Sequence, residues 1–150
     1  MLGNIAKKLR LMGYDVRYWA DIKDEDLIKQ AKKEKRTIIS RDQNLVRRGE
    51  KNGIKSNFLK NQIEIDQLRE IIIKSNLKLI KINGDIARCP ICNSKTHSLL
   101  KKNIQKNIPE KILEYNEKFW ECKTCEKIFW EGTHIKNLQK MVDELNVKRN

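Results

Sequence analysis

All four cysteines of the chain lie in two Cys-x-x-Cys pairs, Cys89 with Cys92 and Cys122 with Cys125. A spacer of two residues lets two thiolates converge on one tetrahedral ion, and a second such pair completes a closed shell of four sulfurs. Such a shell leaves no open position for a substrate, so it stabilises a fold rather than catalysing a reaction. The spacing therefore predicts a structural zinc ion held by all four cysteines.

Two other uses of the cysteines stay open at this point. Two disulfides would suit a secreted protein, but residues 1–4 show no basic segment leading into an apolar one, as a signal peptide does. One pair could form a thioredoxin-like redox site, yet that motif does not require a second copy. Zinc is the favoured interpretation, because a small β-rich module buries too little apolar surface to fold unaided.

The chain has 150 residues and a formal net charge of +13 at pH 7. Such an excess of positive charge attracts polyanions and indicates a nucleic-acid partner, although a lysine-rich proteome would also produce it. The lysines are spread along the chain, which disfavours a basic helix lying on a membrane. No apolar run approaches the roughly 20 residues that span a bilayer. We therefore expect a cytoplasmic protein that makes no membrane contact.

The hydrophobic pattern of the first part of the chain predicts alternating helices and strands. Helices are expected over residues 2–12, from residue 24, over residues 44–49 and over residues 65–75, and strands over residues 15–19, 37–40 and 54–59. The β-branched run at residues 37–40 is typical of a buried parallel strand. Strands that alternate with helices indicate an α/β fold with a parallel sheet and flanking helices.

The pattern of residue types changes near residue 86. Residues 88–93 surround the first cysteine pair, and two short strands, residues 119–122 and 127–130, flank the second pair. A final amphipathic helix is expected from Thr133, because apolar residues then recur at intervals of three and four. We predict an α/β domain over residues 1–85, followed by a small zinc ribbon with a C-terminal helix over residues 86–150.

Two aspartates stand where a parallel sheet would place a metal site. Asp42 follows the strand at residues 37–40, and ligands gather at the carboxyl ends of parallel strands. Asp24 opens the preceding helix and could face the same crevice. Carboxylates suit Mg²⁺ or Mn²⁺, and two or three of them around an ion can generate the hydroxide that attacks a phosphodiester. The alternative for both is a helix N-cap, the commoner use for an aspartate in the position of Asp24.

Several segments, taken in order, resemble one known family. Residues 2–16 look like its opening helix and second strand, and residues 37–42 look like its strand ending in Thr-Arg-Asp, with Ser40 in place of Thr. Residues 88–93 and 122–134 look like its zinc-ribbon signatures. Over essentially its whole length the chain is thus similar to the Mut-seven C-terminal RNase domain family, a PIN-like nuclease fold fused to a zinc ribbon.

The resemblance implies a metal-dependent ribonuclease that hydrolyses RNA with Mg²⁺ or Mn²⁺ and carries a structural zinc ion. Asp42 matches the acid of the Thr-Arg-Asp motif, and Asp24 matches the acid that opens the helix before it. Arg10 and Arg41 match basic positions that would meet phosphate, and Lys7 is a further predicted nucleic-acid contact.

The chain departs from the family at its start. Family members begin with a strand ending in an Asp shortly before the Leu-Gly of the first helix, whereas this chain starts at residues 1–3 with Met-Leu-Gly. We expect that strand and its acid to be absent, with a start assigned at an internal Met as the favoured explanation. A second function stays open: a non-catalytic RNA-binding or ribosome-associated zinc-ribbon protein. The basic surface and the aromatic residues Trp120, Phe129 and Trp130 would then grip RNA without cutting it.

Overall fold

The computed structural model describes residues 2–78, 81–105 and 107–149, and the chain divides into two compact units. The first contains Met1–Ile5 and Tyr18–Lys78, and we call it the parallel unit. The second contains Ala6–Arg17 and Leu79–Asn150, and we call it the cysteine unit. Each unit has its own sheet, with two parallel strands in the first and three antiparallel strands in the second. Helix α1 (Gly3–Leu11) begins in the parallel unit and ends in the cysteine unit.

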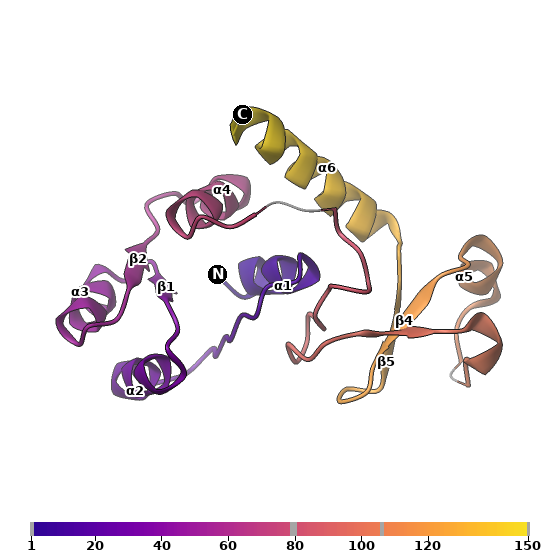
Figure 1. The fold of residues 1–150 in the computed structure, drawn as a ribbon, viewed down its shortest axis with the longest axis horizontal. Helices are drawn as coiled ribbons and strands as arrows, with labels where there is room; N and C mark the ends of the chain where they lie inside the picture. Colours follow the sequence, from indigo (N-terminus) through magenta and orange to yellow (C-terminus); the bar gives the residue numbers. More distant parts are fainter. Residues whose placement is uncertain (1, 79–80, 106, 150) are drawn as a thin grey trace. The chain divides into compact units, whose positions relative to one another are not determined.

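The parallel unit alternates helices and strands after α1 (Figure 1). Its elements are α2 (Asp24–Glu34), β1 (Ile38–Ser40), α3 (Gln43–Lys51), β2 (Ser56–Phe58) and α4 (Glu64–Lys74). β1 and β2 pair in parallel with Ile39 opposite Asn57. Helix α3 connects the two strands and packs against both of them, and α2 packs against α3. The helix–strand alternation and the parallel pairing predicted from the sequence are confirmed.

A small apolar core holds α2 and α3 on this sheet. It consists of the buried side chains of Ile28, Ala31, Ile38, Leu45 and Ile54. Two of them, Ile28 and Ala31, stand three residues apart on α2, which places them on the same face of the helix. The first turn of α2 is acidic, and its last turn is basic, which complements the helix dipole.

The strand predicted over residues 15–19 is wrong, because the structure has no strand there. The alternating pattern is present, but the backbone of Val16 is paired with side chains instead of a neighbouring strand. Its amide donates to Asn93 Oδ1 over 3.1 Å, and its carbonyl accepts a hydrogen bond of 2.9 Å from Arg10 Nε. An alternating pattern forms a strand only where a partner strand supplies the hydrogen bonds.

The cysteine unit contains an antiparallel sheet in the order β3-β4-β5. Its elements are β3 (His97–Leu99), a 3-10 turn (Lys101–Asn103), α5 (Glu110–Tyr115), β4 (Phe119–Cys122), β5 (Lys127–Trp130) and α6 (Thr133–Arg149). The predicted strands β4 and β5 and the predicted C-terminal helix are confirmed. β3 and α5 were not predicted, because neither segment has a clear apolar period.

The interior of the cysteine unit is built around two buried aromatic residues of β4, Phe119 and Trp120. The Trp120 indole lies directly against Gly84, where a Cβ would overlap the ring. Its Nε1 donates a hydrogen bond of 3.0 Å to Asp85 Oδ1. The carbonyl of Gly84 accepts a 2.6 Å bond from the buried hydroxyl of Thr96. This packing holds the residues that lead into the first cysteine pair.

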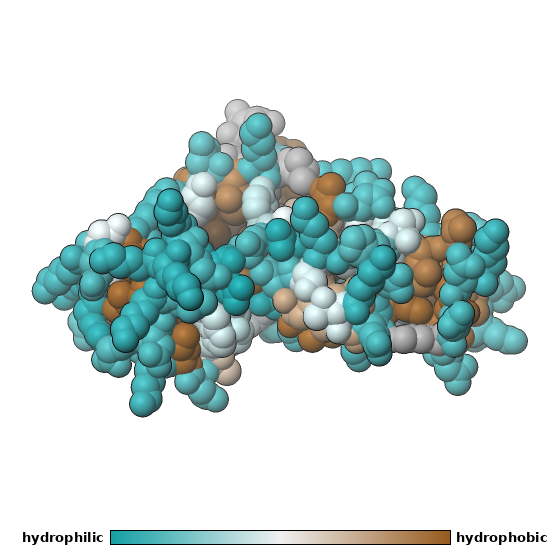
Figure 2. Space-filling model, turned by 60° about the horizontal axis from the view of Figure 1, so that its bottom comes forward, coloured by the Kyte–Doolittle hydropathy of each residue, from teal (hydrophilic) through white to brown (hydrophobic). Residues whose placement is uncertain are grey.

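Hydrophilic residues cover most of the face shown in Figure 2, as expected for a chain with 35% charged residues. Among the described helices, none combines the length and the apolar character needed to cross a membrane.

Candidate metal centre and candidate catalytic residues

The sulfur atoms of the four cysteines converge within the cysteine unit, and all lie within 4.8 Å of one another. The Sγ atoms of Cys89 and Cys125 are 4.0 Å apart, and those of Cys92 and Cys122 are 3.4 Å apart. Zn–S bonds of about 2.3 Å in a tetrahedron separate the sulfurs by about 3.8 Å. All four thiols are free in the structure, and these sulfur separations are close to those of a tetrahedral zinc site and longer than the roughly 2.05 Å of a disulfide bond.

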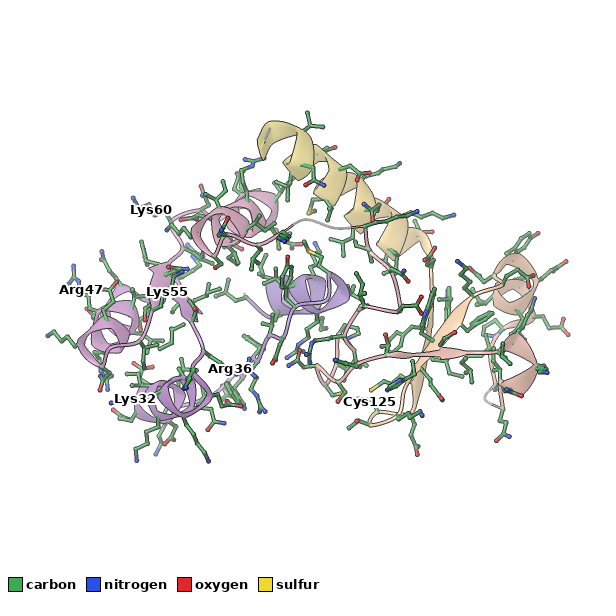
Figure 3. The ribbon with its side chains drawn as sticks, viewed as in Figure 1. Lys32, Arg36, Arg47, Lys55, Lys60 and Cys125 are labelled. Atoms are coloured by element: carbon green, nitrogen blue, oxygen red, sulfur yellow. The ribbon has the colours of Figure 1, made fainter. Side chains whose placement is uncertain are left out.

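Each cysteine pair sits in the same type of turn. In the first knuckle, residues 89–93, the Asn93 amide donates to the Cys89 carbonyl over 2.9 Å. In the second knuckle, residues 122–126, the Glu126 amide donates to the Cys122 carbonyl over 2.7 Å. Asn93 and Glu126 both take a left-handed backbone, with φ of 71° and 59°. The repeated geometry aims two pairs of thiols at one point. Cys125 lies at the tip of the β4–β5 hairpin (Figure 3).

The chemistry of the donor set fits zinc. Four soft thiolates in a tetrahedral arrangement are the usual ligands of a structural zinc ion, which would cross-link the two knuckles here. Burial opposes ionisation of Cys92, but hydrogen bonds from the side chain and backbone of Ser94 lower the pKa of its thiol to about 6. Burial raises the pKa of the Cys89 thiol, and a hydrogen bond with Cys92 raises the pKa of Cys125 to about 12, so among these three thiols Cys92 ionises first. The thiolate is the form that binds a metal.

Asp42 lies at the carboxyl end of β1, as predicted from the sequence, and it is also the N-cap of α3. Its Oδ1 accepts hydrogen bonds from the amides of Asn44 at 2.9 Å and Leu45 at 3.3 Å. Its own amide donates to Ser40 Oγ over 3.0 Å. Asp42 is an exposed residue beside the end of the strand.

Asp24 is the first residue of α2, and the N-cap position belongs to Lys23. The alternative that Asp24 caps this helix is therefore wrong. Its Oδ2 instead accepts from Arg48 Nη1 of α3 over 3.3 Å, and Arg48 Nη2 contacts Glu25 at the same distance. Among the described residues, the cysteines are the one group of three or more side chains able to share a metal, so neither Asp24 nor Asp42 belongs to a cluster of three acids.

The three predicted nucleic-acid contacts differ in exposure. Lys7 on α1 and Arg41 after β1 are exposed. Arg10 is buried, with 8% of its surface exposed, and its guanidinium donates to backbone carbonyls. Because its guanidinium is engaged in these internal contacts, Arg10 is not one of the proposed RNA contacts.

The family described as Mut7-C RNAse domain matches residues 1–142, which includes both predicted acids and all four cysteines. The chain belongs to the Mut7-C RNAse domain family. No curated protein and no solved structure matches the chain. The resemblance inferred from the sequence is confirmed, and the cysteine cluster of this Mut7-C chain is compatible with a zinc site.

The aromatic residues predicted as RNA contacts take part in packing within this Mut7-C chain. Trp120 is 5% exposed, so its ring offers no face to a base. Phe129 and Trp130 are half-buried and line an apolar hollow of about 40 Å³.

Sequence reasoning missed the roles of Arg10 and Asn93, which connect α1 to the first knuckle. The position of Asn93 directly after the first cysteine pair was the available signal, because Asn readily takes a left-handed backbone.

Proposed function

We propose that this Mut7-C RNAse domain protein is a metal-dependent ribonuclease that hydrolyses RNA phosphodiester bonds. The observation that carries the proposal is the exposed carboxylate of Asp42 at the end of a parallel strand, in a chain that belongs to a nuclease family. Carboxylate oxygens at that edge bind Mg²⁺ or Mn²⁺ and orient the attacking water. Asp24 is the proposed second acid, and the cysteines hold zinc for structure.

The proposal extends to the architecture and the location. We assign a PIN-like fold to residues 1–85 and a zinc ribbon with its helix to residues 86–150, and we place the protein in the cytoplasm. The alternation of helices with the parallel strands β1 and β2 supports the first assignment.

Exposed cations of the parallel unit supply the contacts to RNA phosphates. In addition to Arg41, they come from α2, from α3 and from both ends of β2, and four of them are labelled in Figure 3: Lys32, Arg47, Lys55 and Lys60. Together with Lys7 on α1, these cations belong to the excess of basic over acidic residues that gives the chain its net charge of +13. Phosphate contacts of this kind bind RNA without regard to sequence and weaken with salt.

The test is cleavage of a labelled single-stranded RNA by the full chain with Mn²⁺, beside the variant Asp42→Asn. Asn caps a helix as well as Asp does, so this variant keeps α3 intact and removes only the charge. We expect cleavage by the wild type and its loss in Asp42→Asn. Equal cleavage by both proteins would contradict the role of Asp42.

One observation favours a second function, that of a non-catalytic RNA-binding protein. Asp24 is ion-paired with Arg48, and among the described residues neither aspartate belongs to a cluster of three acids. RNA that is bound but never cut, with an affinity that falls steeply between 50 and 200 mM salt, would favour this function over the enzyme.

A further inference from the structure

The last turn of α1 and the stretch that follows it are held by the first knuckle. The Arg10 carbonyl accepts a hydrogen bond of 2.8 Å from the amide of Arg88. The Asn93 side chain accepts from the Val16 amide over 3.1 Å and donates to Asp15 Oδ1 over 2.6 Å. All of these residues belong to the cysteine unit, so the contacts lie within one compact body.

The guanidinium of Arg10 lies against the loop that joins the two ligands of the first pair. Its Nη1 donates to the carbonyl of Pro90 over 2.8 Å and, at 3.5 Å, to that of Ile91, the two residues between the cysteines. Its Nε donates to the Val16 carbonyl over 2.9 Å. One buried side chain thus connects the metal-binding loop with the stretch after α1.

A buried cation is stable only where carbonyls or anions compensate for its lost hydration. Burial lowers the pKa of the Arg10 guanidinium, and the nearby thiols of Cys89 and Cys92 and the carboxylate of Asp15 oppose this effect. A zinc ion with four thiolates carries a net charge of about −2. Arg10 is therefore the buried counter-charge beside an anionic centre, in contrast to the exposed Lys123 of the second knuckle.

We propose that Arg10 is a positioning residue of the zinc centre, and that zinc binding orders residues 14–17 through Arg10 and Asn93. The guanidinium fixes the carbonyls of the loop between two ligands, so the thiolates are held ready for the metal. The coupling is reciprocal, because an interaction that strengthens metal binding is itself strengthened by the metal. The zinc centre thereby sets the conformation of a stretch about 80 residues away in sequence.

The first test compares zinc affinity among full-length variants, by competition with a chromophoric chelator. Arg10→Gln removes the charge and most of the donors, and we expect its affinity to fall by about 10- to 100-fold. Arg10→Lys keeps the charge, so its zinc affinity is expected to fall less than that of Arg10→Gln. The control, Lys123→Gln, removes an exposed charge next to Cys122. Its zinc affinity is expected to stay within about twofold of the wild-type value, because water screens an exposed charge. Equal affinities for the wild type and Arg10→Gln would overturn the proposal.

The second test needs no variant, so it stands even if Arg10→Gln fails to fold. Hydrogen exchange is followed at single amides of the wild-type chain before and after zinc is removed. The Val16 amide should lose its protection, since its partner is Asn93, while the Leu59 amide, which donates to Ser40 in the parallel unit, should keep it. Protection of Val16 that survives zinc removal would overturn the proposed coupling.

Discussion

Arg48 Nη1 lies 3.3 Å from the carboxylate of Asp24, so a cation of α3 neutralises one of the two acids proposed to hold a catalytic metal. Both side chains are about two-fifths exposed, and ion pairs of this kind contribute about 0.2–1 kcal/mol. If Asp24 holds the proposed catalytic ion, the Arg48 guanidinium competes with that ion for the carboxylate. The proposed function then predicts that the metal dependence of cleavage is sensitive to Arg48.

We therefore expect Arg48→Met to lower the Mn²⁺ concentration that gives half-maximal RNA cleavage. The change is limited to about fivefold, because the pair is worth no more than about 1 kcal/mol. Lys51→Met, a neutralised exposed lysine on the same helix, is the matched control and should leave the midpoint unchanged. A midpoint that rises in Arg48→Met alone would mean that Arg48 assists the metal or the RNA rather than competing for Asp24.

The N-cap role of Asp42 can be separated from its proposed catalytic role. Asp42→Ala removes the acceptor of the Asn44 and Leu45 amides, and we expect the free energy of unfolding to fall by about 1 kcal/mol. Asp42→Asn keeps an acceptor and should unfold within a few tenths of a kcal/mol of the wild type. Urea denaturation measures both values. Equal destabilisation by the two substitutions would show that the charge, rather than the cap, stabilises α3.

Replacement of Gly84 tests the packing that leads into the first knuckle. A Cβ at this position would overlap the Trp120 ring, so Gly84→Ala should destabilise the cysteine unit by about 1–3 kcal/mol. Thermal unfolding followed by tryptophan fluorescence measures the shift of the unfolding midpoint. In a Trp120→Ala background the overlap is absent, and the same substitution should cost little. If the cost is the same in both backgrounds, the contact with Trp120 is not its cause.

Glu70 gives the parallel unit a defined pH dependence. Burial raises the pKa of its carboxyl, but hydrogen bonds from the Lys60 and Asn61 amides, the Lys74 ammonium and the Asn61 side chain outweigh this and lower it to about 2, from an ordinary 4.5. The native state thus favours the ionised form. The resulting stability is fully present above pH 4.5 and is lost as the pH falls toward 2.

The corresponding variant is Glu70→Gln, which we expect to lose about 1–3 kcal/mol of unfolding free energy at pH 7. The gap between wild type and variant should shrink as the pH falls from 4.5 to 2, because Glu70 is protonated first in the unfolded state and then, around pH 2, in the native state. Glu50→Gln, at an exposed glutamate of α3, serves as the control and should differ little from the wild type at any pH. A gap for Glu70→Gln that persists to pH 2 would assign the loss to packing.

The sequence predicted the features that depend on local pattern. The apolar positions Ile28 and Ala31 indicated the buried face of α2, and the cysteine spacing indicated a cluster of four thiols before any geometry was known. Such patterns are reliable because the period of a helix and the reach of a two-residue loop are set by local geometry.

The features that sequence reasoning missed depend on partners far away in the chain. Residues 15–19 alternate as a short strand would, but the amide of Val16 donates its hydrogen bond to Asn93, 77 residues away. Arg10 has the position of a surface cation on α1, and its burial follows from carbonyls of the first knuckle. Contacts at such separations leave no periodic signal, because they depend on how distant segments pack.

Zinc K-edge X-ray absorption on the purified full chain tests most directly the claim that one closed centre organises the cysteine unit. The structure predicts a single zinc ion with four sulfur neighbours at about 2.3 Å, and no nitrogen or oxygen ligand. A shell with fewer than four sulfurs, or with a mixture of sulfur and lighter ligands, would contradict the assignment of Cys89, Cys92, Cys122 and Cys125 as the complete ligand set.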